Sequence, residues 1–325
     1  MSQPLISAVI PTHNRAELLR GSLESLACQS LAPEQYEVVV VDDGSADATR
    51  EVCDSLTSRM ELKYFCIDHS GISAAKNLGI FAAQAPIVLF FDDDDCAAPT
   101  LLEEHLACHR RYPKECTAVL GYTAWAPSLR VTQVMHYVMD VGRLLFCYNM
   151  PSGKRLDFTY FWGGRSSCKR SFLVRHGVFR QEFRAILEDI ELGYRLARHG
   201  LEVVFHRDAV QYMTRPITFD EFCRRCQRQG QAQVQFGRLY PHDPLVQQYC
   251  RLSDSQQRWP EMAAHLSGKV ARVRELEGPL DAGADQDRDC RVGELHGLYR
   301  WTFDAFRVKS VVETLAAQER CPAPA

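Results

Sequence analysis

Short apolar runs rich in β-branched residues alternate with amphipathic stretches through the first half of the chain. Runs of this length are typical of buried strands, and the stretches between them carry apolar residues at helical spacing. The predicted strands are Leu5–Pro11, Tyr36–Val41, Leu62–Ile67, Ile87–Phe91 and Ala118–Tyr122. The predicted helices lie near residues 15–29, 47–59, 72–84 and 99–112. This alternation predicts an α/β fold with a mostly parallel, twisted sheet flanked by helices.

Residues with capping chemistry mark the starts of two of these helices. Asn14 and Glu17 are spaced as in a capping box, in which Asn14 caps the amide of Glu17 and Glu17 reaches back. Pro99 suits the first turn of the helix near 99–112.

The second half of the chain is less regular. Residues 123–185 are aromatic and follow no clear period, so no elements are assigned there. A helix near 187–200 and a strand over Leu201–Phe205 follow, and the pattern becomes helical from about residue 217.

Two later segments have a distinct composition. Gly278–Asp289 is rich in Gly, Ala and Asp, and we expect a flexible connection there. In Leu298–Ala316, aromatic residues recur at helical spacing. This pattern favours a packing helix over a helix that lies on a membrane surface.

The composition excludes several classes of protein. The 325 residues have a formal net charge of −3 and lack the strongly basic surface that nucleic-acid binding requires. The first apolar run is too short for a signal peptide, and no run approaches the roughly 18 apolar residues of a transmembrane helix. We therefore expect a cytoplasmic protein, with contact to the cytoplasmic face of a membrane left open.

The cysteines agree with a reducing compartment. There are 13 of them, scattered and odd in number, which indicates free thiols rather than a disulfide framework. Cys223 and Cys226 form one CxxC pair, but no second pair follows at zinc-site spacing. Two thiols on one helix face are favoured over a metal or redox site.

Four consecutive aspartates, Asp92 to Asp95, follow the predicted strand Ile87–Phe91. Ligands of open α/β sheets bind at the carboxyl ends of strands, and adjacent carboxylates repel one another unless a positive charge is near. Carboxylates are ligands for Mg²⁺ or Mn²⁺, and Asp92 and Asp94 alternate onto one side of an extended chain. Metal and donor binding is favoured over the alternative, in which the aspartates only cap the next helix.

A second acidic turn, Asp42-Asp43-Gly44, follows another predicted strand. Gly44 permits a tight turn, and the two carboxylates can accept hydrogen bonds from a ribose or a base edge. Asp-Gly turns are common, so the location at a strand's carboxyl end gives this one its weight.

Six segments of the chain form a recognisable ordered set. They are Ala8–Arg15, Val41–Ser45, Gly71–Gly79, Phe90–Asp95, Phe161–Ser167 and Leu187–Leu196. Over about residues 5–235 this set resembles family 2 glycosyltransferases, which have the Rossmann-like GT-A fold. The resemblance implies a GT-A domain over residues 1–235, with a nucleotide-sugar-binding half at 1–120 and an acceptor and catalytic half at 121–235. Residues 236–325 would form a helical C-terminal extension.

The resemblance also implies which residues bind the donor, a nucleotide-diphosphate sugar that we expect to be UDP-linked. The residues that match the family's substrate contacts are Pro11, Thr12, Asp42, Asp43, Lys76, Asn77, Asp92, Asp93, Gly164 and Glu188. By its chemistry Lys76 suits a phosphate, although an exposed lysine on a helix explains it equally well. Arg224 and Arg225 resemble a basic segment that closes over donor phosphates, and a solvated helix face is an equal alternative.

The pair Glu188 and Asp189 matches the family's acidic motif, which supplies the general base of inverting members. The resemblance implies that Asp189 takes the proton of an acceptor hydroxyl as it attacks the anomeric carbon opposite the leaving diphosphate. Mg²⁺ or Mn²⁺, held by Asp92 and Asp94, would offset the charge of that diphosphate. The alternative is that these acidic residues only decorate a helix start, which explains Glu191 better than Asp189.

Two stretches depart from the family pattern. Met213 stands where many members carry a histidine ligand, and a thioether is a poor ligand for a hard cation. His206 lies nearby, although a histidine at a strand end is more often structural. Gly177–Glu182 differs from the family on the acceptor side.

Two other classes compete with this interpretation. A sugar-nucleotide pyrophosphorylase or other nucleotidyltransferase shares the fold type, but it usually has a glycine-rich loop where this chain has Pro-Thr-His-Asn-Arg. A non-catalytic nucleotide-sugar-binding module would not depend on Asp189. The expected acceptor is a glycan, a lipid-linked glycan or a protein, in glycan or glycoconjugate synthesis.

Overall fold

The computed structural model describes residues 3–183, 186–282 and 288–320. By its internal contacts the chain separates into two compact units. An α/β unit comprises Met1–Leu129 and Tyr148–Arg215, and a helical unit comprises Arg130–Cys147 and Pro216–Ala325. The predicted domain boundary at residue 235 stays a prediction.

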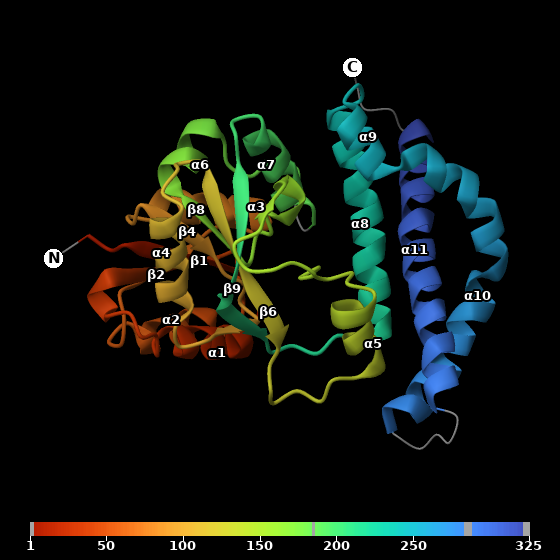
Figure 1. The fold of residues 1–325 in the computed structure, drawn as a ribbon, viewed down its shortest axis with the longest axis horizontal. Helices are drawn as coiled ribbons and strands as arrows, with labels where there is room; N and C mark the ends of the chain where they lie inside the picture. The colour runs from red at the N-terminus through yellow and green to blue at the C-terminus, as the bar shows by residue number, and fades with distance from the viewer. Residues whose placement is uncertain (1–2, 184–185, 283–287, 321–325) are drawn as a thin grey trace. The chain divides into compact units, whose positions relative to one another are not determined.

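The parallel half of the sheet lies in the first part of the α/β unit (Figure 1). Its strands, in spatial order, are β3 (Leu62–Cys66), β2 (Tyr36–Asp42), β1 (Ile6–Thr12) and β4 (Ile87–Phe90). The intervening helices are α1 (Ala16–Leu26), α2 (Thr49–Leu56), α3 (Ile72–Ala82) and α4 (Leu101–Arg111). The predicted order of strands and helices in this half is therefore confirmed, with shifts of a few residues at the ends.

The remaining strands extend this sheet. Their order continues from β4 through β8 (Ser166–Lys169), β6 (Thr117–Trp125) and β9 (Glu202–Met213) to β5 (Asp95–Ala97), with β7 (Arg155–Leu156) paired to β9. Strand β8 is antiparallel to both β4 and β6. The sheet is thus mixed in its second half, where no elements are predicted for residues 123–185.

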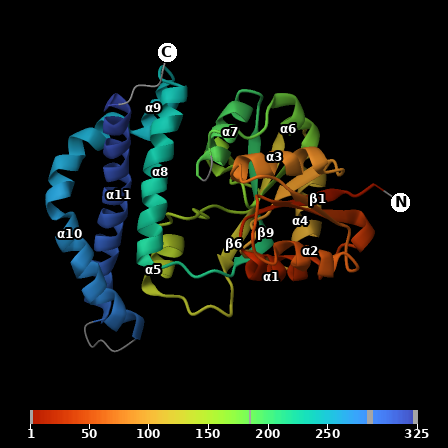
Figure 2. The same cartoon turned by 180° about the vertical axis from the view of Figure 1, so that it is seen from behind.

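Helices cover both faces of the sheet because the strands are apolar on both sides. Val38 to Val41 in β2 are all fully buried, as a strand between two helical layers requires. Figures 1 and 2 show α1 and α2 on one side of the sheet and α3 and α6 (Arg170–His176) on the other. A Cβ at Gly79 of α3 would overlap the side chain of Val9 in β1, so a glycine there lets this helix lie close to the sheet.

Strand β9 is longer than the predicted strand Leu201–Phe205. Its pairing with β6 jumps from Phe205 to Val210, so the charged residues between them leave the regular ladder and the strand then resumes. This bulge interrupts the alternation of polar and apolar residues, and for that reason the pattern ends too early. Helix α7 (Glu188–Ala197) precedes β9, as predicted.

The predicted capping box at Asn14 is wrong. Helix α1 has no side-chain cap of its own; instead the amide of Ala16 donates to Asp47 Oδ2 at 2.9 Å. Asn14 has a positive φ of 52°, its amide donates to Ser45 Oγ, and its Oδ1 accepts from the amide of Ala46. The loop after β2 therefore caps the helix after β1, a tertiary contact that local spacing does not reveal.

The helical unit is built around a parallel pair of long helices, α8 (Phe219–Leu239) and α11 (Arg288–Arg320). The other helices are α5 (Gln133–His136), the π-helix η2 (Tyr137–Val141), α9 (Pro244–Cys250) and α10 (Leu252–Ala282). Aromatic rings of Phe219, Phe222, Tyr299 and Phe303 pack between α8 and α11. The predicted packing role of Leu298–Ala316 is therefore confirmed.

Two further expectations concern this unit. Helix α10 continues into the predicted flexible stretch Gly278–Asp289 as far as Ala282, and residues 283–287 lie outside the described residues. Within the part of the chain that the structure describes, no helix is long and apolar enough to cross a membrane.

Candidate active site

The carboxyl ends of β1, β2 and β4 meet at one edge of the α/β unit and bring three predicted site residues together. The hydroxyl of Thr12 donates to Asp93 Oδ2 at 2.8 Å, and the amide of Asp43 donates to the carbonyl of Thr12 at 2.9 Å. All three residues are buried, and so is Pro11 before them. Parallel strands end at the same edge, so this convergence follows from the sheet order β2-β1-β4.

The two carboxylates after β2 hold the neighbouring loops. Asp42 accepts hydrogen bonds from the hydroxyl of Tyr64 at 2.6 Å and from the amide of Ser45 at 2.8 Å. Asp43 accepts from the amides of Ser70 at 2.7 Å and Gly71 at 2.9 Å. Both residues therefore hold the adjoining loops in place through contacts within the chain.

Two histidines that the sequence analysis did not select stand beside Asp43. Nδ1 of His69 lies 3.0 Å from Asp43 Oδ2, and Nδ1 of His13 lies 2.8 Å from the carbonyl oxygen of Asp43. Their rings are 4.3 Å apart between centroids. His13 belongs to the segment Ala8–Arg15, but nothing in the sequence relates it to His69.

The acidic run after β4 is neutralised by arginines from the chain itself. Arg165 donates to Asp92 Oδ2 at 2.5 Å and to Asp95 Oδ2 at 3.0 Å, and its guanidinium is nearly inaccessible. Gln211 of β9 also donates to Asp95. Side chains of the protein thus offset the mutual repulsion of these carboxylates, and their charge alone does not require a bound cation.

The other two aspartates face more exposed arginines. Arg15 Nη1 lies 2.8 Å from Asp93 Oδ1 and 3.5 Å from Asp94 Oδ2, and Arg215 Nε lies 3.2 Å from the same Asp94 oxygen. The side chains of Arg15 and Arg215 are 43% and 36% exposed, whereas that of Asp94 is 11% exposed. Two guanidiniums that can move into solvent therefore cover the Asp94 carboxylate.

The environments of the four aspartates differ. Burial opposes ionisation of Asp92, but the charges of Arg165 and Lys76 outweigh it and lower the pKa of Asp92. Burial raises the pKa of Asp93 to about 6, and burial also raises the pKa of Asp95. Asp92 is therefore the most firmly ionised of these three, as a ligand for a cation should be.

Carboxylates are the ligands that a hard divalent cation prefers, but the chain turns at Asp93 and Asp94, so the predicted extended arrangement of Asp92 and Asp94 is wrong. Asp92 and Asp94 offer carboxylate oxygens, and the arginines on Asp94 are exposed enough to give way. Among the described residues, the one group of three converging metal-ligand atoms from His, Cys, Asp or Glu is Glu104, His206 and Asp208. A cation at Asp92 and Asp94 would therefore need further oxygens from donor phosphates.

Met213 and His206 lie in different surroundings. Met213 pairs in register with Asp95, so it lies beside the acidic run but brings only a thioether. His206 Nε2 lies 2.7 Å from Glu104 Oε2, on the bulge of β9. The histidine near this strand is thus occupied elsewhere and does not replace the missing ligand.

The predicted base lies at the start of α7. Asp189 Oδ2 accepts from the amide of Gly163 at 2.9 Å, and Glu188 Oε1 lies 2.8 Å from Nζ of Lys76. Burial and then the negative charge of Glu188 raise the pKa of Asp189 to about 6, with Lys76 acting in the opposite direction. Asp189 is therefore mostly ionised at neutral pH and still basic enough to accept a proton.

Two glycines join the base to the acidic run. A Cβ on Gly164 would overlap the carboxylate of Asp92, and a Cβ on Gly163 would lie 2.8 Å from Lys76 Nζ and 3.1 Å from Asp189 Cβ. These two positions accept no side chain without displacing charged groups. The pair Gly163-Gly164 thus separates Asp92 from Asp189 by backbone alone.

The remaining predicted residues have other surroundings. Lys76 is 2% exposed, so its ammonium serves Glu188 in this structure. Asn77 exchanges two hydrogen bonds of 2.8 Å with the backbone of Phe179. Arg224 and Arg225 are exposed on α8, in the helical unit.

Sequence reasoning missed the arginines as site residues. Arg15 and Arg165 lie inside segments that carry the family resemblance, and Arg215 follows the end of β9. Their side chains form hydrogen bonds with residues far away along the chain. Arg165 and Thr123 are 42 positions apart, and Arg215 and Asp94 are 121 positions apart. The signal available was the acidic run itself, because buried carboxylates need cationic or hydrogen-bonding partners.

Comparison with known proteins gives a family and a fold. Residues 7–183 match the profile of glycosyl transferase family 2. Validoxylamine A glucosyltransferase of Streptomyces hygroscopicus subsp. limoneus is 32% identical over 239 residues, which cover 63% of this chain and 51% of that protein. Chondroitin synthase of Escherichia coli is 26% identical over 242 residues, which cover 65% of this chain and 35% of that protein. The chain thus spans about half or less of the length of these relatives.

Two solved structures share the fold. The mannosyltransferase PcManGT from Pyrobaculum calidifontis, in complex with GDP-Man and Mn²⁺, has a TM-score of 0.66 at 20% identity, covering 98% of this chain and 89% of that one. S. aureus TarS 1–349 in complex with UDP has a TM-score of 0.54 at 17% identity, covering 97% of this chain and 91% of that one.

Proposed function

The chain belongs to glycosyl transferase family 2 and has the GT-A fold, and from this premise we propose that it transfers a sugar from a nucleotide-diphosphate donor to an acceptor hydroxyl. We propose a UDP-linked donor and inversion at the anomeric carbon. Solved structures of similar fold that contain UDP or GDP-Man support a nucleotide-sugar donor.

The donor pocket is proposed at the carboxyl ends of β1, β2 and β4. Thr12, Asp42, Asp43 and Asn77 form its frame, since their polar atoms hold one another and the adjoining loops. Pro11 precedes Thr12 in β1, and Gly164 leaves room for Asp92. This arrangement keeps the pocket wall in place before the donor arrives.

The diphosphate is proposed to lie by the acidic run. Asp92 and Asp94 would hold Mg²⁺ or Mn²⁺, and the Mn²⁺ in the Pyrobaculum structure supports that choice. When bound, the cation would offset the charge that grows on the leaving diphosphate. Arg15 and Arg215, displaced from Asp94, would then contact phosphate oxygens.

Asp189 is proposed as the general base. As the acceptor oxygen forms its bond to the anomeric carbon, the bond from that carbon to the diphosphate oxygen breaks, and the acceptor proton passes to Asp189. Glu188 and Lys76 form an ion pair beside this carboxylate, and their charges act on its pKa in opposite directions. Arg224 and Arg225 remain proposed donor-phosphate contacts from a closing segment.

One observation carries this proposal: Gly163-Gly164 lies against both Asp92 and Asp189, so the proposed metal-binding carboxylate and the proposed base contact the same two-residue backbone segment. Rate enhancement by a positioned base is typically about 10² to 10⁴. We therefore expect Asp189→Asn to lower transfer by that factor while nucleotide-sugar binding stays within about twofold.

The test uses purified full chain with Mn²⁺ and a panel of nucleotide sugars, and it measures donor hydrolysis and transfer by mass spectrometry. Glu17→Gln, an exposed carboxylate of α1, is the matched control and should behave as the wild type. Full activity of Asp189→Asn would contradict the base. Donor binding without any turnover by the wild type would favour a non-catalytic module. Formation of a nucleoside triphosphate and a sugar 1-phosphate on addition of pyrophosphate would favour a nucleotidyltransferase.

The acceptor is proposed to be a glycan, a lipid-linked glycan or a protein. We retain the proposal of action in the cytoplasm, at a membrane face where the acceptor is lipid-linked. Free cysteines throughout the described residues support a reducing compartment.

A further inference from the structure

A hollow of about 790 Å³ lies within the helical unit, between α8, α10 and α11. Part of its wall is apolar and includes Phe222, Met262 and Trp301. The rest is basic, with four arginines against two carboxylates among the lining residues. A volume of this size with an apolar wall and a few polar groups is typical of sites for small ligands.

Two of the arginines form a fixed network. Arg258 and Arg307 both donate to the carboxylate of Asp304, and Arg307 Nη1 also donates to Gln233 Oε1 at 3.0 Å. Burial opposes ionisation of Asp304, but Arg307 and Arg258 outweigh it and lower its pKa. Arg258 also contacts Asp254, so the four arginines of this wall face three carboxylates, Asp254, Glu261 and Asp304, and one positive charge is left over.

The other two arginines are more accessible. Arg251 Nη2 lies 3.0 Å from Asp254, a carboxylate that it shares with Arg258, and the Arg251 side chain is 57% exposed. Arg300 is exposed and has no ion pair with any residue in the described part of the chain. A guanidinium has five N–H donors, so several donors at this wall are free to bind an anion.

We propose that this hollow binds a phosphate ester that carries an apolar group, with Arg251 and Arg300 on the phosphate and the apolar group against Trp301. Guanidiniums pair with phosphate oxygens in forked geometry, and an apolar wall shields such pairs from water. An uncharged sugar would form no ion pair with these two guanidiniums. The inference does not depend on the proposed sugar transfer, because its site and its test involve binding alone.

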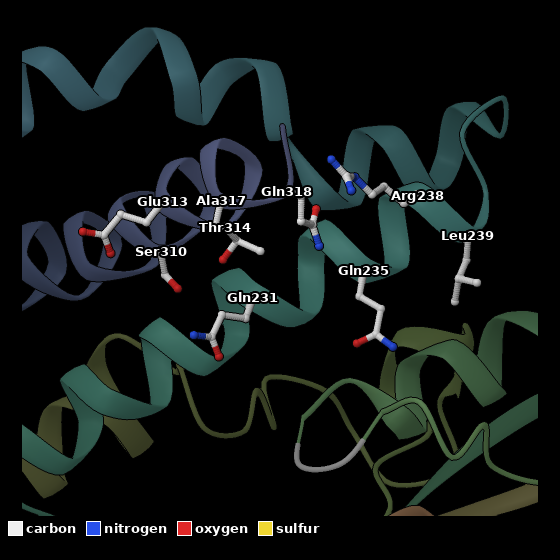
Figure 3. Close-up of a pocket in the computed structure, with 9 residues that line it drawn as sticks. All are labelled: Gln231, Gln235, Arg238, Leu239, Ser310, Glu313, Thr314, Ala317 and Gln318. Atoms are coloured by element: carbon white, nitrogen blue, oxygen red, sulfur yellow. The ribbon is translucent and has the colours of Figure 1, made fainter. Parts of the chain in front are cut away.

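A second hollow on the same unit provides the matched control. It has about 660 Å³ and lies between α8 and α11, where Gln231, Gln235 and Gln318 surround it (Figure 3). Its one arginine, Arg238, is matched by one glutamate, Glu313. This hollow therefore offers similar room without surplus positive charge.

The test measures binding of decyl phosphate, below its micelle concentration, to the full chain by isothermal titration calorimetry. We expect saturable binding that is at least about tenfold tighter than binding of decyl glucoside, since only the former carries the charged group. Arg251→Gln/Arg300→Gln should weaken it by about tenfold or more, and Arg238→Gln/Arg272→Gln, which removes the same charge elsewhere, by less than about twofold.

Arg300→Lys, which keeps the charge but not the fork, should give an intermediate affinity if the guanidinium binds phosphate directly. Equal binding by Arg251→Gln/Arg300→Gln and the wild type, equal binding of decyl glucoside, or no binding of decyl phosphate would each overturn the proposal. Thermal melting of each variant checks that the fold is retained.

Two further experiments distinguish a soluble phosphate ester from a lipid headgroup. Competition by glycerol 3-phosphate alone would indicate a soluble phosphate ester. Sedimentation with vesicles that contain phosphatidic acid, but not with pure phosphatidylcholine vesicles, would indicate a lipid headgroup. Either result supports the shared chemistry.

Discussion

Lys76 is a buried cation placed among carboxylates. Its ammonium lies 2.8 Å from Glu188, and its charge favours the ionised forms of Asp92 and Asp189. Burial opposes the charge of Lys76, but these carboxylates outweigh it and raise the pKa of Lys76. One side chain thus connects the proposed metal-binding carboxylate to the proposed base, a role that its sequence neighbours do not indicate.

The pH dependence of transfer should report this environment. Asp189 must be ionised to act as a base, so kcat/KM should rise with pH through about 6. Glu188→Gln removes a negative charge that raises the pKa of Asp189 and leaves Lys76, which lowers it. We expect the acid limb of the profile to move to lower pH by about one unit.

The measurement is a pH series of kcat/KM for the wild type, Glu188→Gln and the control Glu17→Gln. A limb that moves to higher pH in Glu188→Gln would refute the assignment of that limb to Asp189.

Gly164→Ala should disrupt the site from the backbone. Its Cβ would overlap the Asp92 carboxylate, so Asp92 and Arg165 must shift. Overpacking of this kind costs about 1–3 kcal/mol, and donor binding should fall together with stability. Gly268→Ala in α10, where a Cβ meets nothing within 4 Å, should be neutral or raise stability by up to about 1 kcal/mol. Urea unfolding and donor titration of both variants check this, and equal behaviour would show that the close approach is not maintained in solution.

At the level of elements, the pair α8 and α11 shows how one position fixes the distance between helices. A Cβ on Gly230 would overlap the carbonyl oxygen of Arg307 and lie 2.9 Å from Ser310 Cβ. The two helices are therefore in close backbone contact at Gly230. Gly230 therefore has a packing function within the helical unit.

Gly230→Ala should force α8 and α11 apart and destabilise the helical unit by about 1–3 kcal/mol. The proposed donor site contains no residue of this helix pair other than Arg224 and Arg225, so donor affinity at low temperature should change little. Circular dichroism melting measures the first effect and donor titration the second. Gly278→Ala, with open space around its Cβ, is the control. A Gly230→Ala variant as stable as the wild type would contradict the close contact.

At the level of the whole molecule, ligand binding and stability are linked. A donor that binds only the folded chain raises the free energy of unfolding by about 2.7 kcal/mol at roughly 100 times its Kd. If Asp92 and Asp94 hold the cation together with donor phosphates, cation and donor should stabilise the chain more together than separately.

We therefore expect the thermal shift caused by the nucleotide sugar to increase with Mn²⁺ and to decrease with EDTA. Asp94→Asn should remove the Mn²⁺ dependence. The control Glu104→Gln/His206→Ala should retain it, because that variant removes the other group of possible metal ligands among the described residues. An unchanged shift in EDTA would mean that Arg15 and Arg215 serve the diphosphate without a cation.

The sequence by itself determined the periodic part of the fold and the location of the chemistry. Apolar runs and helical spacing predict β1 to β4 and α1 to α4, because residues buried between two helical layers must be apolar at every position. The acidic residues at strand ends, Asp42, Asp43 and Asp92 to Asp95, were identified because parallel strands end at one edge. These features depend on local patterns that can be read along the chain.

Only the tertiary structure decided how those residues are paired. Arg165 bridges Asp92 and Asp95, Lys76 joins Glu188 across 112 positions, and the loop after β2 caps α1. The mixed strand order around β8 and the bulge of β9 likewise arise from packing between distant segments. Ion pairs and close backbone contacts depend on distances in space, and a sequence specifies those distances only through the complete fold.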